Sequence, residues 1–182
     1  MFDIRKIQEQ AIFRAIMAAS DEATAAGIVY GEHGQYAAED NATWVKATMK
    51  RLEDSFDRPA VKEIRMNCQC GYGFDEKLAL VNELLAASSN LADFAGQDKA
   101  RAAGLSYADG KLYLQFPFCP CPMLAEVDKL ATYTWCECTT GYSKVLFEKA
   151  FGCEVAVELL KSIKAGDDVC LMEIVPRGAI WK

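Results

Sequence analysis

Six of the eight cysteines in this 182-residue chain occur as three Cys-x-Cys pairs. On an extended segment, residues two apart leave the same face with Cα atoms about 6.6 Å apart, and a small bend brings both sulfurs onto one soft metal ion. Each pair is therefore a candidate bidentate metal ligand. The three pairs are Cys68 with Cys70, Cys119 with Cys121, and Cys136 with Cys138.

Disulfide bonds are the alternative use of these thiols. A bridge across a single intervening residue strains the torsions that a relaxed disulfide needs, although bridges between different pairs stay open. The first ten residues mix charged and apolar side chains and contain no apolar run of secretory length. We therefore expect a cytoplasmic, reducing setting, in which metal binding or thiol chemistry is favoured over a disulfide framework.

The second and third pairs make the best predicted metal site. Fourteen residues separate Cys121 from Cys136, and we expect both pairs at strand ends, where one hairpin-like excursion would bring four thiolates together. Four thiolates are the composition of a closed tetrahedral zinc site. Cys68 and Cys70 are alternative ligands that would replace one pair, complete a six-thiolate cluster or act alone as a redox pair. An iron–sulfur cluster would use the same ligands, but the spacings match none of the usual ferredoxin runs, so zinc is favoured.

Cys138 is also the candidate nucleophile. It precedes Thr139 and Thr140, where a helix is expected to begin, and the positive end of the helix dipole favours the thiolate over the thiol. We therefore predict a lowered pKa for Cys138. A thiol- or zinc-dependent hydrolase or reductase acting on a small molecule is accordingly the alternative to a metal-binding module that senses or binds a small-molecule ligand.

The remaining cysteines and the one histidine are assigned simpler roles. Cys153 and Cys170 stand alone on predicted strands and are expected to pack in the core, as free cysteines usually do. His33 is expected to lie exposed in a loop, and Cys–His catalysis would need it beside a thiol.

The elements that must position these residues divide the chain into a mainly helical half, 1–104, and a sheet-rich half, 105–182. Apolar residues recur at the helical period from Ile4 onward until Gly27 interrupts the pattern. Asp40 or Asn41 caps a second helix, and Arg58-Pro59 opens a short third one. A further helix is expected from Phe74 to Leu85.

The second half is predicted to be built around strands. Asp109-Gly110 is a strong hairpin-turn dipeptide. The expected elements after it are strands at 112–116 and 132–135, a helix from 139 to 150 ended by Gly152, and a hairpin of 153–159 with 169–175. The chain is thus predicted to be a single α+β domain spanning 1–182, with N-terminal helices packed on a largely antiparallel sheet.

Charge excludes several partners. The chain has 20 basic and 26 acidic residues, a formal net charge of −6, and no basic cluster of the kind that tracks phosphates. Nucleic acid and anionic membrane surfaces are therefore not expected to bind. No segment approaches the roughly 20 apolar residues of a membrane span. A small molecule is the expected partner.

The segment from Trp135 to Val175 resembles a known pattern. A cysteine-rich stretch is followed by Thr140-Gly141-Tyr142, by Gly152, and by a closing run from Lys161 to Ile174. This is similar to the C-terminal half of 4-vinyl reductase type domains and of the L-2-amino-thiazoline-4-carboxylic acid hydrolase-like family. The resemblance implies an α+β fold related to small-ligand sensors, often homodimeric, with cysteines near a pocket and sometimes zinc. The matching positions are Cys136, Cys138, Gly166, Asp167 and Cys170.

The resemblance also has limits that bear on cofactor and activity. Related heme-binding sensors use a histidine ligand, and His33 lies outside the matching segment, so heme is not expected. No catalytic residue carries over from the hydrolase label, because no matching set of acid, base and nucleophile is present.

Overall fold

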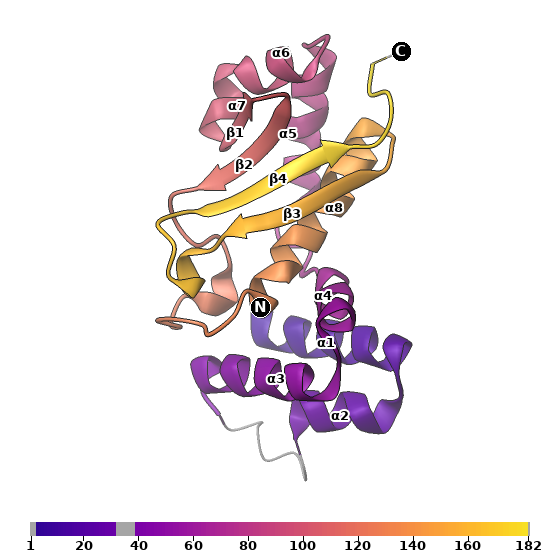
Figure 1. The fold of residues 1–182 in the computed structure, drawn as a ribbon, viewed down its shortest axis with the longest axis vertical. Helices are drawn as coiled ribbons and strands as arrows, with labels where there is room; N and C mark the ends of the chain where they lie inside the picture. Colours follow the sequence, from indigo (N-terminus) through magenta and orange to yellow (C-terminus); the bar gives the residue numbers. More distant parts are fainter. Residues whose placement is uncertain (1–2, 32–38, 182) are drawn as a thin grey trace. The chain divides into compact units, whose positions relative to one another are not determined.

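The computed structural model describes residues 3–31 and 39–181 and has an α+β fold, as the sequence predicts. Within these residues the strands form one four-stranded antiparallel sheet with the order β1-β2-β4-β3 (Figure 1). His33 lies outside the described residues, so its predicted loop position stays a prediction.

The chain forms two compact units, and neither is a continuous stretch of sequence. The helical unit comprises Met1–Cys70, Pro120–Gly141 and Lys164–Gly166. The sheet unit comprises Gly71–Cys119, Tyr142–Ile163 and Asp167–Lys182. The expected organisation as a single domain stays a prediction.

Four capped helices build most of the helical unit. In each case an aspartate directly before the helix accepts a hydrogen bond from the backbone N–H three residues later, which satisfies one of the donors left open at a helix start. The caps are Asp3, Asp21, Asp40 and Asp57. The helices are α1 (Ile4–Ala19), α2 (Glu22–Tyr30), α3 (Asn41–Ser55) and α4 (Arg58–Met66).

Two of these helices differ from the sequence expectation in extent. The helix predicted to run from Ile4 to Gly27 ends at Ala19, because Asp21 caps a new helix, α2, in which Gly27 is an interior residue. The starts of α3 and α4 are as predicted, at Asp40 and at Arg58-Pro59.

The core of the helical unit centres on two tryptophans. Trp44 of α3 and Trp135 are both almost fully buried, and their rings meet edge to face with centroids 5.8 Å apart. Trp135 belongs to a short 3-10 helix, η3 (Thr134–Cys136), that leads directly into α8 (Glu137–Phe151). The predicted strand at 132–135 is therefore wrong: the aromatic and β-branched residues suit a strand, but burial of Trp135 against Trp44 decides the local structure.

The sheet unit carries the strands and the remaining helices. Asp109 and Gly110 both have positive φ, 51° and 79°, and form the predicted hairpin turn between β1 and β2. β3 and β4 pair as the second predicted antiparallel hairpin. The strands are β1 (Leu105–Ala108), β2 (Lys111–Phe116), β3 (Val155–Lys161) and β4 (Cys170–Pro176).

Helices cover one face of this sheet. In Figure 1, α5 and α8 lie behind the strands, and Leu84 of α5 and Phe147 of α8 share one buried core with Leu112 and Ile174 of the sheet. The helices of this unit are α5 (Phe74–Ala86), α6 (Leu91–Gly96), α7 (Asp98–Ala102) and the part of α8 from Tyr142 onward. As predicted, Gly152 ends α8, with a φ of 67°.

The two isolated cysteines behave differently. Cys170 is the first residue of β4 and is buried, which confirms its predicted core position. Cys153 lies before β3, which begins at Val155, and is half-buried, so its predicted place on a strand is wrong.

No helix in residues 3–31 and 39–181 is both long and apolar enough to cross a membrane.

Candidate functional site

Cysteines from all three Cys-x-Cys pairs lie close enough to the start of α8, in the helical unit, to act electrostatically on Cys138. Negative charge on Cys70, Cys121 or Cys68 would raise the pKa of Cys138, so these three sulfurs lie within its electrostatic reach. Cys68 and Cys138 are buried, whereas Cys70 and Cys121 are half-buried. We call these four residues the thiol centre.

A close contact between α4 and α8 positions the buried half of the thiol centre. The thiol of Cys138, the second residue of α8, donates to the backbone carbonyl of Cys68 over 3.1 Å. Gly141, one turn further along α8, lies against the carbonyl oxygen of Met66: a Cβ atom on Gly141 would be 1.8 Å from that oxygen. Glycine at this position is therefore what allows the two helices to approach closely enough for Cys138 to reach Cys68.

Burial governs the chemistry of both buried thiols. Burial raises the pKa of Cys138 from its ordinary value of 9.0 to about 12, against the opposing positive charge of Arg65. Burial likewise raises the pKa of Cys68, again opposed by Arg65. The predicted lowering of the Cys138 pKa is wrong, because the helix dipole contributes roughly 0.3 to 1 kcal/mol, less than one pKa unit, whereas desolvation is larger.

Arg65 of α4 is the charged residue of the site. Its side chain is fully buried, and Nε and Nη2 donate to the carbonyl oxygens of Thr134 and Trp135 over 3.4 and 2.9 Å. The guanidinium lies over the Trp135 ring, 4.5 Å from its centroid. In the part of the chain that the structure describes, none of the ion pairs includes Arg65, and Nη1 has no hydrogen-bond partner.

Buried polar atoms without a partner concentrate around this centre. Gln8 donates from Nε2 to the sulfur of Cys138 over 3.9 Å, but its Oε1 is unsatisfied. Buried polar atoms are nearly always hydrogen-bonded, so this concentration marks the start of α8 as a place suited to a polar or ionic ligand. The atoms without a partner among the described residues are Gln8 Oε1, Arg65 Nη1, Trp135 Nε1, Glu137 Oε2 and Thr140 Oγ1, together with Glu39 Oε2 elsewhere.

The four predicted metal ligands are divided between the helical unit and the sheet unit. Cys121 precedes the 3-10 helix η2 (Pro122–Leu124), Cys136 is the last residue of η3, and both belong to the helical unit, whereas Cys119 belongs to the sheet unit. Within residues 3–31 and 39–181, no three cysteine, histidine, aspartate or glutamate side chains are arranged to hold a metal ion as they stand. The set Cys119, Cys121, Cys136 and Cys138 therefore stays a prediction; Cys121 of this set and the alternative ligands Cys68 and Cys70 are within electrostatic reach of Cys138.

Sequence reasoning missed Arg65 and Gln8. In the sequence, Arg65 is one basic residue in the last turn of a short helix, and Gln8 is one polar residue within α1. No motif identifies either one. The helical spacing of apolar residues in α1 places Gln8 on the buried face of that helix, beside Ala11 and Ile12. A polar residue on an apolar face is the one sequence signal that could have identified Gln8.

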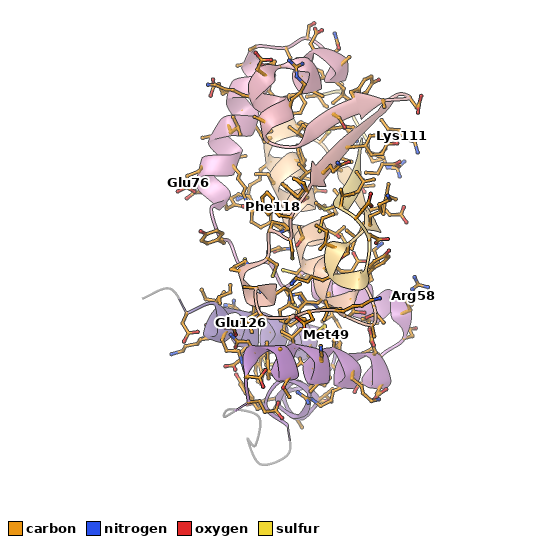
Figure 2. The ribbon with its side chains drawn as sticks, turned by 90° about the vertical axis from the view of Figure 1, so that its left-hand side faces the viewer. Met49, Arg58, Glu76, Lys111, Phe118 and Glu126 are labelled. Carbon is orange, nitrogen blue, oxygen red and sulfur yellow. The ribbon has the colours of Figure 1, made fainter. Side chains whose placement is uncertain are left out.

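The sheet unit contains a separate open hollow of about 460 Å³. Leu112, Ile174 and Trp181 line it, and at its rim Lys111, labelled in Figure 2, pairs with Glu173 over 2.7 Å. No cysteine is among the residues that line this hollow. The expectation of cysteines near a pocket, which the resemblance implies, stays a prediction.

A family model described as a family of unknown function, DUF6144, matches residues 1–181. No curated protein and no solved structure matches the chain. The resemblance to 4-vinyl reductase type domains stays a prediction.

Proposed function

We propose that this chain, which belongs to the DUF6144 family, is a cytoplasmic metal-binding protein that holds zinc at the thiol centre. The observation that supports this most is the buried Arg65, which forms no ion pair with a carboxylate among the described residues and whose charge acts on the thiols of Cys68 and Cys138. An unpaired buried cation is costly, and four thiolates around Zn²⁺ carry an excess of negative charge that would offset it.

The raised pKa values of Cys68 and Cys138 mean that zinc would have to compete with protons at these two sulfurs. A thiol that coordinates zinc loses its proton outright, even where the metal-free protein keeps that proton up to high pH. Zinc would therefore displace protons from Cys68 and Cys138, and its apparent affinity would rise with pH.

The four sulfurs of the thiol centre could bind one zinc ion only after some of these side chains move. Cys70 and Cys121 are half-buried, so they have room to change rotamer about χ1 and turn their sulfurs toward Cys68 and Cys138. Three chain segments would then be tied together at one point, which is the usual role of a closed site with four sulfur ligands.

The test is the metal content of reduced, purified protein. We expect about one zinc per chain, and loss of that zinc in the serine variants of Cys68, Cys70, Cys121 and Cys138. Cys153→Ser is the matched control, since Cys153 is half-buried and belongs to the sheet unit. Cys119→Ser and Cys136→Ser separate this ligand set from the one predicted by spacing. Metal-free protein of normal stability would contradict the proposal.

A thiol- or zinc-dependent hydrolase or reductase is the second candidate function. The observation that favours it is Glu137, whose buried Oε2 has no hydrogen-bond partner in the described residues and which directly precedes Cys138. A carboxylate beside a metal-bound water would act as a general base. Three sulfur ligands plus water on the metal would support the zinc-dependent form of this candidate, and four sulfur ligands would exclude that form.

A further inference from the structure

We infer that the hollow in the sheet unit is a binding site for a small carboxylic acid with an apolar body, whose carboxylate is held by Lys111 at the rim. This site is separate from the proposed metal site. Every described residue that lines the hollow belongs to the sheet unit, whereas the thiol centre belongs to the helical unit. The two proposals therefore stand or fall independently.

The hollow has the size and the lining of a site for a small molecule. Its volume of about 460 Å³ lies within the range of roughly 300 to 1,000 Å³ that is usual for such sites, which are mainly apolar with a few polar groups. Of the twelve described residues that line it, eight have apolar side chains, and the others are two glycines, one serine and one lysine. Most of the surface of a bound molecule would therefore contact hydrocarbon, and burial of an apolar body there is favourable.

The sheet provides the apolar floor of the hollow. Leu112 of β2 and Ile174 of β4 lie opposite each other in the antiparallel register, and both are buried. Both line the hollow, together with Gly110 of the hairpin turn that precedes β2. The hollow is thus built on the end of the sheet next to this turn, on a rigid part of the unit.

The segment of residues 177–181, which follows β4, is anchored at both ends and forms another wall (Figure 1). At its start, the backbone N–H of Arg177 donates to the carbonyl of Glu154 over 2.7 Å, which continues the pairing of β3 with β4. At its end, Trp181 packs against the core of the unit, and its Nε1 donates to the carbonyl of Leu85 in α5 over 3.5 Å. The indole of Trp181 is therefore a fixed, half-buried aromatic surface beside the floor.

The charge of Lys111 selects an anionic ligand. Among the described residues that line the hollow, Lys111 is the one that carries a charge, and its partner Glu173 does not line it. The ammonium group of Lys111 donates to Oε2 of Glu173 over 2.7 Å, which holds it at the rim. An ammonium group has three N–H donors, so two more are available to a carboxylate. A ligand ammonium at the same place would meet a like charge.

The experiment uses three probes that share one apolar body and differ in charge: 4-phenylbutyrate, 4-phenylbutyramide and 4-phenylbutylamine. Binding to the full chain is followed by the indole N–H signals in proton–nitrogen correlation spectra. Of the three tryptophans in the sequence, Trp44 and Trp135 belong to the helical unit, and Trp181 lines the hollow. Trp181→Phe identifies the Trp181 signal, and the other two signals serve as internal controls.

Lys111→Met tests the charge, since methionine keeps much of the length of the side chain but has no ammonium group. Lys161→Met is the matched control. Lys161 is also a strand residue of the sheet unit with one carboxylate partner, Asp168, over 3.0 Å, and its side chain is 44% exposed against 50% for Lys111. It does not line the hollow.

4-Phenylbutyrate is expected to bind with a Kd on the order of 1 mM and to shift the signal of Trp181 but not those of Trp44 and Trp135. The neutral amide is expected to bind roughly 2- to 10-fold more weakly, and the amine more weakly still. Lys111→Met is expected to bind the carboxylate and the amide equally well, whereas Lys161→Met keeps the preference of the wild-type protein.

Two kinds of result would overturn the inference. A Trp181 signal that no probe shifts at tenfold the expected Kd, or larger shifts at Trp44 or Trp135, would show that the hollow is not the site. Equal affinity of the wild-type protein for the three probes, or an unchanged preference in Lys111→Met, would show that Lys111 does not select a carboxylate. The comparison of the three probes on the wild-type protein needs no variant to fold, and none of these results depends on the metal content.

Discussion

A Gly141→Ala variant is expected to lose about 3 kcal/mol or more of its free energy of unfolding. The added Cβ would lie 1.8 Å from the Met66 carbonyl oxygen, and also 2.5 Å from the carbonyl carbon. Backbone atoms cannot rotate away as the end of a side chain can, so α4 and α8 must separate at this point. For a chain of this length the loss corresponds to a midpoint lower by roughly 6 to 12 °C, measured by circular dichroism of metal-free protein.

Gly27→Ala is the matched control for this substitution. Gly27 also lies within a helix, α2, but no atom lies within 4 Å of its ideal Cβ position. Alanine there is expected to leave stability unchanged or to raise it by up to about 1 kcal/mol, from helix propensity alone. Equal midpoints for Gly141→Ala and wild type would show that α4 and α8 are not in close contact. If the protein binds zinc as proposed, its zinc content should fall with Gly141→Ala, because Cys138 moves away from Cys68.

Cys138 is expected to be the last cysteine of the thiol centre to react with iodoacetamide when the protein is folded and free of metal. Its pKa of about 12, against an ordinary 9.0, leaves a thiolate fraction about a thousandfold lower at neutral pH. Cys70 and Cys121 are half-buried and should be labelled first. Mass-spectrometric mapping after brief labelling gives the order directly.

The same pKa fixes how stability depends on pH. Since the folded state holds the Cys138 proton more tightly than the unfolded chain, this stabilising contribution is complete below about pH 9 and is lost as the pH rises toward 12.

The control for the iodoacetamide experiment is labelling of the protein unfolded in urea, because there Cys138 should react as fast as Cys153. Early labelling of Cys138 in the folded protein would contradict its burial and restore it as a nucleophile.

The sequence predicts most of the elements because their signals are local. Asp40 starts a helix by capping, Arg58-Pro59 opens another, and Asp109-Gly110 forms a hairpin turn, each through contacts within four residues. The local signals of residues 132–135 predict the wrong structure, a strand, because a contact between Trp135 and Trp44 decides their conformation. That contact joins residues far apart in the sequence.

The sequence likewise predicts only those features of the candidate site that depend on local signals. The Cys-x-Cys pairs identify the thiols, but which pairs meet depends on the packing of α4 against α8, which joins Cys68 to Cys138 across 70 positions. The helix predicted to start at 139 begins at Glu137, so Cys138 lies inside α8, and its pKa is raised where the sequence predicts a lowered one. Local sequence reveals a helix dipole, whereas burial is a property of the whole fold.

The discontinuity of the helical unit has a consequence for how the protein is made. Cys68 and Cys70 leave the ribosome with α4, but Cys121 and Cys138 follow much later, and Cys138 comes 70 residues after Cys68. At 5 to 20 residues per second, the first pair waits roughly 4 to 14 s for its partners. During that interval the nascent chain exposes two thiols on an incomplete helical core, which also lacks Trp135. The helical unit, and with it the proposed zinc site, can therefore be completed only after residue 138 has emerged.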